Sequence, residues 1–173
     1  MQILDHMETH GHEQLALWTD PAAGLRAFIA IHDTTLGPAL GGTRIWPYPT
    51  EDAALMDVLR LSRAMTYKSA LAGLSQGGGK GLIMADSRTG KTQALMESYG
   101  RFVESLGGRY ITTEDVGASA QDMEWISHET KHVVGLPPAR GGSGNPSGQT
   151  GFGVYQAMRA CAAATREWKA ATG

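Results

Sequence analysis

Three consecutive glycines, Gly77, Gly78 and Gly79, stand directly before Lys80 and constrain the fold more than any other stretch of this 173-residue chain. Glycine is costly to order, but it admits backbone angles and close approaches that other residues refuse. Apolar residues lie on both sides, within 71–74 and 82–84. A flexible surface turn is the alternative, but these flanks favour a loop between two buried segments, where binding sites are often built.

A second lysine, Lys68, lies twelve residues before Lys80. One ammonium group can pair with a substrate carboxylate. Burial and a neighbouring cation would both lower the pKa of the other lysine, and a neutral lysine can act as a general base. If the two lysines meet in space, they predict a site for a small acid whose neighbouring carbon undergoes proton or water chemistry.

Hydrophobic periodicity along the chain favours strands that alternate with amphipathic helices. We expect a hairpin of strands at 14–19 and 25–32, followed by an ordered loop at 33–44. A helix from an N-cap at Thr50 to about residue 67, a strand at 81–85, a helix at 91–106 and a strand at 109–113 come next. The last expected elements are a short helix from Ser119 to about residue 129, a strand at 132–135 and a helix at about 148–171. This order predicts an α/β, three-layer domain with a mixed, mostly parallel sheet flanked by helices.

The strand expected at 109–113 delivers Glu114 and Asp115 at its carboxyl end. In open α/β sheets, ligands bind at that end of the strands. Asp115 is therefore a candidate functional carboxylate, with helix capping as the alternative.

Composition excludes several classes of function. Net charge is −2 and no basic cluster is interleaved with aromatic residues, so no nucleic-acid partner is expected. No apolar run reaches the roughly 20 residues of a membrane span, and no signal peptide is visible at the start of the sequence. The single cysteine, Cys161, fits a reducing compartment. We expect a cytoplasmic protein without a membrane partner.

Two further motifs are candidate sites. His6, His10 and His12 could hold a metal ion, but Gly11 interrupts their spacing, and a solvated N-terminal turn is the simpler interpretation. Residues 85–92 match a loose phosphate-binding loop between a strand and a helix. That loop has only one glycine, Gly90, and begins with an acid, so Lys91 is interpreted as a solvated residue of the helix. No dinucleotide fingerprint follows any strand.

Five segments together resemble the leucine dehydrogenase family, which includes enzymes acting on valine, phenylalanine and glutamate. They are 29–44 (IAIHDTTLGPALGGTR), 59–68 (LRLSRAMTYK), 73–80 (GLSQGGGK), 108–117 (GRYITTEDVG) and 143–147 (SGNPS). The resemblance runs from about residue 11 to about residue 160. It is to the N-terminal domain of that family, which binds substrate and makes subunit contacts.

The resemblance implies reversible, NAD-dependent oxidative deamination of an L-amino acid to a 2-oxo acid and ammonia. Lys68 would hold the substrate carboxylate, and Lys80 would activate the water that attacks the iminium carbon. Asp115 would relay the proton to and from nitrogen. No metal site is expected.

The same resemblance implies where the rest of the substrate and the cofactor would lie. Gly41 and Gly42 would contact the substrate through backbone groups, and Leu40 would form a wall of the side-chain pocket. Thr113 stands where leucine-specific members tend to have a smaller apolar residue, a departure that bears on the preferred amino acid. Ser147 and Thr150 would approach NAD.

The resemblance also implies a division of the chain at residue 147. Residues 1–147 would form the substrate-binding and oligomerisation domain, and 148–173 a helix leading to an NAD-binding Rossmann domain, which is absent from this sequence. A homo-oligomer is expected, and a separate Rossmann-domain chain is a possible partner. The alternatives are a non-catalytic amino-acid-binding or assembly module and a nucleotide-binding protein acting through residues 85–92.

Overall fold

Strands and helices alternate along the chain, as the hydrophobic pattern predicts. The computed structural model describes residues 2–142, 144 and 146–172, with side chains through residue 166. The strands are β1 (Gln14–Asp20), β2 (Leu25–Asp33), β3 (Ala39–Trp46), β4 (Gly77–Met84) and β5 (Tyr110–Glu114). The helices are α1 (Ile3–His10), α2 (Glu51–Leu71), α3 (Gln93–Ser105), α4 (Ala120–Ile126), the short 3₁₀ helix Pro138–Arg140 and α5 (Ser147–Thr172).

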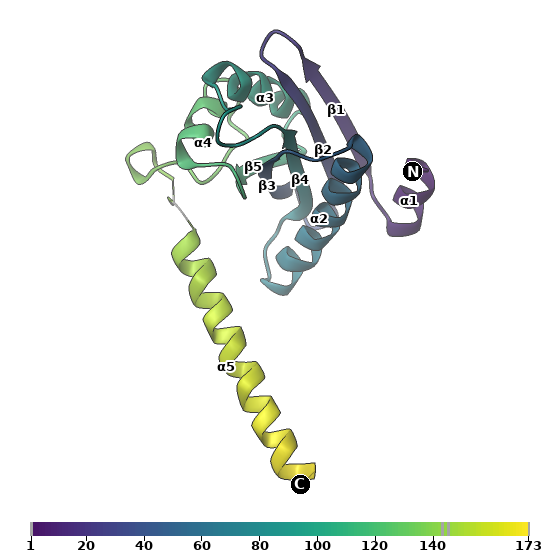
Figure 1. The fold of residues 1–173 in the computed structure, drawn as a ribbon, viewed down its shortest axis with the longest axis vertical. Helices are drawn as coiled ribbons and strands as arrows, with labels where there is room; N and C mark the ends of the chain where they lie inside the picture. The colour runs from purple at the N-terminus through teal and green to yellow at the C-terminus, as the bar shows by residue number, and fades with distance from the viewer. Residues whose placement is uncertain (1, 143, 145, 173) are drawn as a thin grey trace.

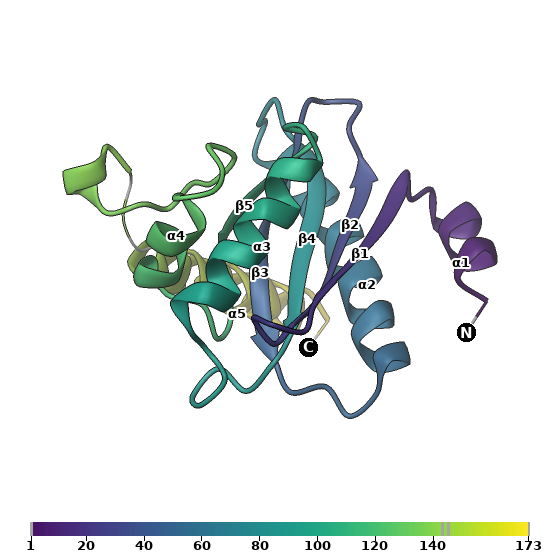
Figure 2. The same cartoon turned by 90° about the horizontal axis from the view of Figure 1, so that it is seen from above.

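The five strands form one mixed sheet in the order β1-β2-β4-β3-β5. β2 pairs antiparallel with β1 and with β4, whereas β3 pairs parallel with β4 and with β5. Only β2 therefore runs against the other strands. Helix α2 covers one face and α3 with α4 covers the other (Figure 1 and Figure 2). This arrangement confirms the predicted three-layer α/β domain and its opening hairpin.

Side-chain alternation along the strands divides the core into two layers. On β2, Ile29 and Ile31 belong to the cluster beneath α3 and α4, whereas Phe28 and Ala30 belong to the cluster beneath α2. Successive side chains of a strand point to opposite faces, and both faces of β2 are covered by a helical layer. Its nearly continuous apolar sequence is therefore buried on both sides.

The prediction that the three glycines form a loop is wrong, because all three lie in the buried strand β4. A Cβ on Gly77 would lie 2.1 Å from the carbonyl oxygen of Asp33, and one on Gly78 would lie 2.2 Å from the backbone nitrogen of Thr66. The glycines are needed because the backbone of Asp33, at the end of β2, and the backbone of Thr66, in α2, approach this strand closely.

The expected loop at 33–44 is also partly wrong, because residues from 39 onward form β3. The glycines of this segment and Pro38 just before it do not predict a strand, since both residue types are unfavourable in strands. Pairing with β4 on one side and β5 on the other supplies the hydrogen bonds that local propensity does not favour. Tertiary pairing, and not the local sequence, therefore determines that this segment is a strand.

Two element boundaries differ from the sequence-based expectation. Helix α2 starts after the predicted N-cap, Thr50, whose side chain accepts a hydrogen bond from the backbone of Ala53, but it extends to Leu71. Lys68 thus lies in the last turn of α2 and not beyond its end. The strand expected at 132–135 is reduced to one bridge between Val133 and Thr112.

Helix α5 extends away from the sheet (Figure 1). Its apolar residues Phe152, Val154, Tyr155 and Met158 are all more than half exposed. Among the described residues, no helix is both long enough and apolar enough to cross a bilayer.

Candidate active site

A buried lysine and a carboxylate meet on the α2 side of the sheet. Lys80 comes from the middle of β4, and Asp115 follows the last residue of β5. The Lys80 Nζ lies 2.8 Å from the Asp115 Oδ2. The structure thereby brings together the two residues that the sequence analysis nominated for catalysis.

The surroundings of Lys80 make its ammonium group easier to deprotonate. Burial lowers the pKa of Lys80 below its ordinary value, and the Asp115 carboxylate offsets part of that effect. The charge of Arg44 lowers the pKa of Lys80 further. The neighbouring cation that the sequence analysis expected is therefore Arg44 and not Lys68. A lysine that gives up its proton readily is suited to general-base chemistry.

Asp115 remains ionised despite its partial burial. Burial raises the pKa of its carboxyl group, but the charges and hydrogen bonds of Lys80 and Arg44 outweigh this effect, so that the pKa is lowered overall. Arg44 Nε donates to Asp115 Oδ2 across 3.0 Å. Asp115 is therefore a carboxylate that can accept a proton.

A network of polar groups continues outward from Asp115. Arg44 Nη1 donates across 2.8 Å to Asp57 Oδ2, which also accepts a hydrogen bond from the Tyr48 hydroxyl. Burial and the bond to Asp57 raise the pKa of Tyr48 to about 12. Sequence reasoning missed Arg44, Asp57 and Tyr48. The available signal was an arginine two residues after Gly42, which alternation places on the same face of β3.

The predicted substrate-pocket residues lie on this same face. Alternation from Arg44 and Lys80 assigns Leu40 and Gly42 of β3, together with Thr113 of β5, to the α2 side of the sheet. Helix α2 packs mainly against β2 and β4. Leu40 and Thr113 are accordingly only half-buried. The face beside the Lys80–Asp115 pair is thus accessible to a small molecule.

The backbone at Gly41 and Gly42 touches its neighbours directly. A Cβ on Gly41 would lie 1.7 Å from the carbonyl oxygen of Gly79, and one on Gly42 would lie 2.7 Å from the Cβ of Asp115. The Tyr110 hydroxyl donates to the Gly41 carbonyl across 2.6 Å. These glycines allow β3 to sit close enough to β4 and β5 for Lys80 and Asp115 to meet.

Three other predicted residues lie at exposed positions. Lys68 is exposed, two residues after Thr66, which touches β4 at Gly78. Ser147 and Thr150 are exposed on the first turn of α5. Residues 143 and 145 of the predicted 143–147 motif lie outside the described residues.

Glu114 points away from the Lys80–Asp115 pair. Its Oε1 is buried without a hydrogen-bond partner, and burial followed by the charge of Asp122 raises the pKa of its carboxyl group. Asp122 belongs to α4, on the opposite side of the sheet. The two consecutive acids at the end of β5 therefore serve different faces of the molecule.

The loop at residues 85–92 is not shaped as a phosphate cradle. Asp86 accepts hydrogen bonds from the backbone N–H groups of Arg88, Thr89 and Gly90. Lys91 is not solvated as expected, because its ammonium group donates to the Gly117 carbonyl and to Asp122. The groups that would hold a phosphate are therefore occupied within the protein.

The three N-terminal histidines lie close together, with ring centroids of His6 and His10 4.4 Å apart and those of His6 and His12 6.0 Å apart. In the part of the chain that the structure describes, no group of three or more histidine, cysteine or acidic side chains is arranged to hold a metal ion.

Comparison with known proteins places the chain in a family. The sequence profile of the Glu/Leu/Phe/Val dehydrogenase dimerisation domain matches residues 12–132. The chain belongs to the Glu/Leu/Phe/Val dehydrogenase family. The resemblance inferred from the five segments is therefore confirmed.

Members of the Glu/Leu/Phe/Val dehydrogenase family with close similarity to this chain act on apolar amino acids according to their names. A leucine dehydrogenase of Bacillus subtilis is 53% identical over 164 residues, which cover 95% of this chain and 45% of that protein. A valine dehydrogenase of Streptomyces virginiae is 52% identical over 162 residues, covering 94% of this chain and 45% of that protein. The chain thus spans under half the length of these relatives.

Solved structures agree with the sequence matches. The crystal structure of L-tryptophan dehydrogenase from Nostoc punctiforme has a TM-score of 0.74 and 52% identity, covering 76% of this chain and 39% of that chain. Glutamate dehydrogenase from Peptoniphilus asaccharolyticus has a TM-score of 0.70 and 25% identity over 95% of this chain. The sheet and its flanking helices are therefore a family fold.

Proposed function

We propose that this chain is the substrate-binding and proton-transfer half of an NAD-dependent branched-chain L-amino-acid dehydrogenase that resembles leucine dehydrogenases. The observation that supports this most directly is the pairing of Lys80 and Asp115 at 2.8 Å on the accessible face of the sheet. The names of the relatives, leucine and valine dehydrogenases, support the choice of an apolar amino acid.

Lys80 and Asp115 have complementary tasks in this proposal. The ionised Asp115 accepts a proton from the substrate ammonium group and returns it in the reverse direction. Lys80, whose pKa burial lowers, takes a proton from the water that attacks the iminium carbon. The close contact of the two groups lets a proton pass between them without entering bulk water.

Substrate orientation comes from residues around this pair. Lys68 pairs with the substrate carboxylate, since its exposed ammonium lies at the end of α2, next to the point where that helix meets β4. Backbone groups of Gly41 and Gly42 contact the substrate main chain. Leu40 and Thr113 contact its side chain.

NAD would be held only in part by this chain. Ser147 and Thr150 lie exposed on the first turn of α5, where their side chains can reach a cofactor. No strand-to-helix turn in the described ranges has the glycine pattern that holds a dinucleotide pyrophosphate. A bound NAD would supply the acceptor for the hydride that leaves the substrate Cα. We assign residues 1–147 to substrate binding and oligomerisation, and 148–173 to the connection with a dinucleotide-binding domain.

A homo-oligomer is part of the proposal. The matched profile describes a dimerisation domain. β1 is an edge strand, and Leu17 on it is exposed, which leaves apolar surface and backbone hydrogen-bonding groups for a second copy. Light scattering of the purified protein that gives a monomer at all concentrations would contradict this part alone.

The test is NAD reduction by the purified chain with L-leucine, alone and with the separately produced dinucleotide-binding domain of a leucine dehydrogenase. We expect activity only in the mixture, and its loss with Lys80→Met. Calorimetric titration with L-leucine and its 2-oxo acid is the companion measurement. No activity and no binding, in a protein that circular dichroism shows to be folded, would favour the alternative of a pure assembly module.

A further inference from the structure

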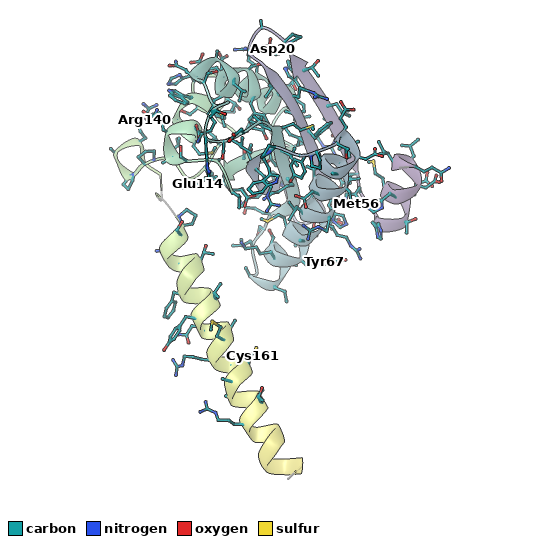
Figure 3. The ribbon with its side chains drawn as sticks, in the orientation of Figure 1. Asp20, Met56, Tyr67, Glu114, Arg140 and Cys161 are labelled. Carbon is teal, nitrogen blue, oxygen red and sulfur yellow. The ribbon has the colours of Figure 1, made fainter. Side chains whose placement is uncertain are left out.

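A cavity of about 530 Å³ lies between the N-terminal segment and α2. Three histidines, His6, His10 and His12, line one side, and Arg60 and Arg63 line the other. Met56 and Tyr67, labelled in Figure 3, also line it and stand about three helical turns apart on α2. The volume falls in the range of roughly 300–1,000 Å³ that is usual for small-molecule sites.

The cavity is rich in basic groups. None of its eight lining residues is acidic. Arg60 is paired with Asp57, but Arg63 has no carboxylate partner among the described residues. Arg63 Nη1 instead donates to His10 Nδ1 across 3.1 Å, and its Nε donates to the Tyr67 hydroxyl across 3.1 Å. A guanidinium with only neutral partners has charge available for an anion.

His12 adds an unsatisfied group to this cavity. The side chain is 9% exposed, and its Nε2 lies 2.9 Å from the Leu59 carbonyl, so Nε2 holds the proton of the neutral ring. Its Nδ1 is buried and has no hydrogen-bond partner. A buried polar atom without a partner costs free energy. If the ring takes up a second proton, Nδ1 becomes a donor for an anion oxygen.

We propose that this cavity binds a phosphate group, either free or as part of a small phosphomonoester, through Arg63 and His12. The planar fork of arginine matches phosphate oxygens. A dianion also suits a cavity with several basic groups and no acid. Because the cavity is much larger than a phosphate ion, Met56 and Tyr67 offer contact surface for the organic part of an ester. This site is separate from the Lys80–Asp115 pair and does not depend on the proposed dehydrogenase function.

Binding at this site should be linked to proton uptake. Burial lowers the pKa of His12, although its bond to Leu59 opposes this, and the charges of His32, His6 and His10 lower it further. Burial, His10 and Arg63 lower the pKa of His6. A bound dianion would raise both pKa values. The affinity for the phosphate dianion should therefore increase as pH falls.

Charged and titratable groups face His12 from each element packed against it. They are His6 and His10 of α1, His32 of β2, and Arg60, Arg63 and Tyr67 of α2. Of these, His32 is already bonded through both ring nitrogens, to Thr66 and to the His10 carbonyl. Nearly all of these groups are basic, so an anion is the ligand that relieves their mutual repulsion.

The experiment is calorimetric titration with inorganic phosphate and, separately, glycerol 3-phosphate at about pH 6 and about pH 8. We expect one site per chain and, for the concentration of dianion present at each pH, at least about tenfold tighter binding at the lower pH. Tighter binding of glycerol 3-phosphate would identify an ester as the ligand, and equal binding would identify free phosphate. No saturable binding of either probe, or affinity that does not depend on pH, would overturn the proposal.

Arg63→Met should weaken binding by at least about tenfold, as expected for loss of a charge-assisted bidentate contact. Arg101→Met is the matched control, because Arg101 lies on α3 on the opposite face of the sheet. Equal weakening by both variants would overturn the location. NMR titration of the histidines in the unmodified protein provides a measurement that needs no variant. Phosphate should raise the pKa of His12, and an unchanged pKa would contradict its role.

Discussion

Two lysine–aspartate pairs in this molecule have opposite distributions of burial. In the Lys80–Asp115 pair, the lysine side chain is 5% exposed and the aspartate 24%. In the Lys91–Asp122 pair, the lysine is 23% exposed and the aspartate 2%. Both pairs are close, at 2.8 Å and 2.6 Å. One pair thus buries its cation and the other its anion.

The surrounding hydrogen bonds explain what each pair is suited to do. Asp122 accepts from the backbone and hydroxyl of Ser119 in a capping box at the start of α4, and Lys91 also donates to the Gly117 carbonyl. By contrast, Asp115 is the one partner of the Lys80 ammonium within the described part of the chain. A pair whose polar atoms are all hydrogen-bonded stabilises the fold. A buried cation whose single partner is a partly exposed carboxylate is instead available for chemistry.

The largest expected effect is on activity. Lys80→Met should lower leucine deamination in the reconstituted mixture by about 10²–10⁴-fold, since a positioned general base contributes roughly that factor. Lys80→Arg should not restore activity, because the guanidinium stays protonated. Steady-state kinetics measure the effect, with circular dichroism to confirm folding. Retention of wild-type kcat by Lys80→Met would remove the chemical distinction between the two pairs.

Lys91→Met should act on stability instead. Loss of the cation leaves Asp122 buried without an opposite charge, which should cost about 2–3 kcal/mol, less than for a fully buried pair because Lys91 is partly exposed. Urea unfolding measures the change. Activity per folded molecule should stay unchanged. If Lys80→Met destabilised the protein more than Lys91→Met, the assignment of roles would be reversed.

Arg44→Met tests whether the neighbouring charge contributes to the chemistry of the Lys80–Asp115 pair, which distinguishes it from the Lys91–Asp122 pair. Loss of the bond to Asp115 should lower kcat on the order of tenfold through misplacement of the carboxylate. Because Arg44 lowers the pKa of both Lys80 and Asp115, its removal should raise both values. The pH profile of activity should therefore move to higher pH. Arg44→Lys, which keeps a positive charge at this position, should show a smaller shift. A profile that does not move would indicate a purely structural role.

The smallest expected effect is on acid stability. Because the pKa of Asp115 is lowered on folding, its ionised form stabilises the protein above the ordinary aspartate pKa of about 3.9. That contribution is lost as pH falls through the lowered, folded-state pKa. Asp115→Asn should therefore show a shallower loss of Tm on acidification below about pH 4. Parallel Tm curves for the variant and the unmodified protein would contradict a lowered pKa.

Local signals in the sequence were sufficient for much of the fold. The apolar strands of the hairpin, the N-caps Thr50 and Ser119 and the strand before Asp115 are all where the sequence predicts them. Each depends on periodicity or on hydrogen bonds between near neighbours, which a short window contains. The nomination of Lys80 and Asp115 rested on the same local cues together with the family resemblance.

Only the tertiary structure decided how those residues are used. In the folded protein, Gly77, Gly78 and Gly79 lie in a buried strand, and Lys91 donates to an aspartate 31 positions away. It also placed Arg44, not Lys68, among the charges that lower the pKa of Lys80. Burial and charge proximity depend on contacts between segments distant in the chain, so the sequence determined which chemical groups are present and the fold determined their protonation.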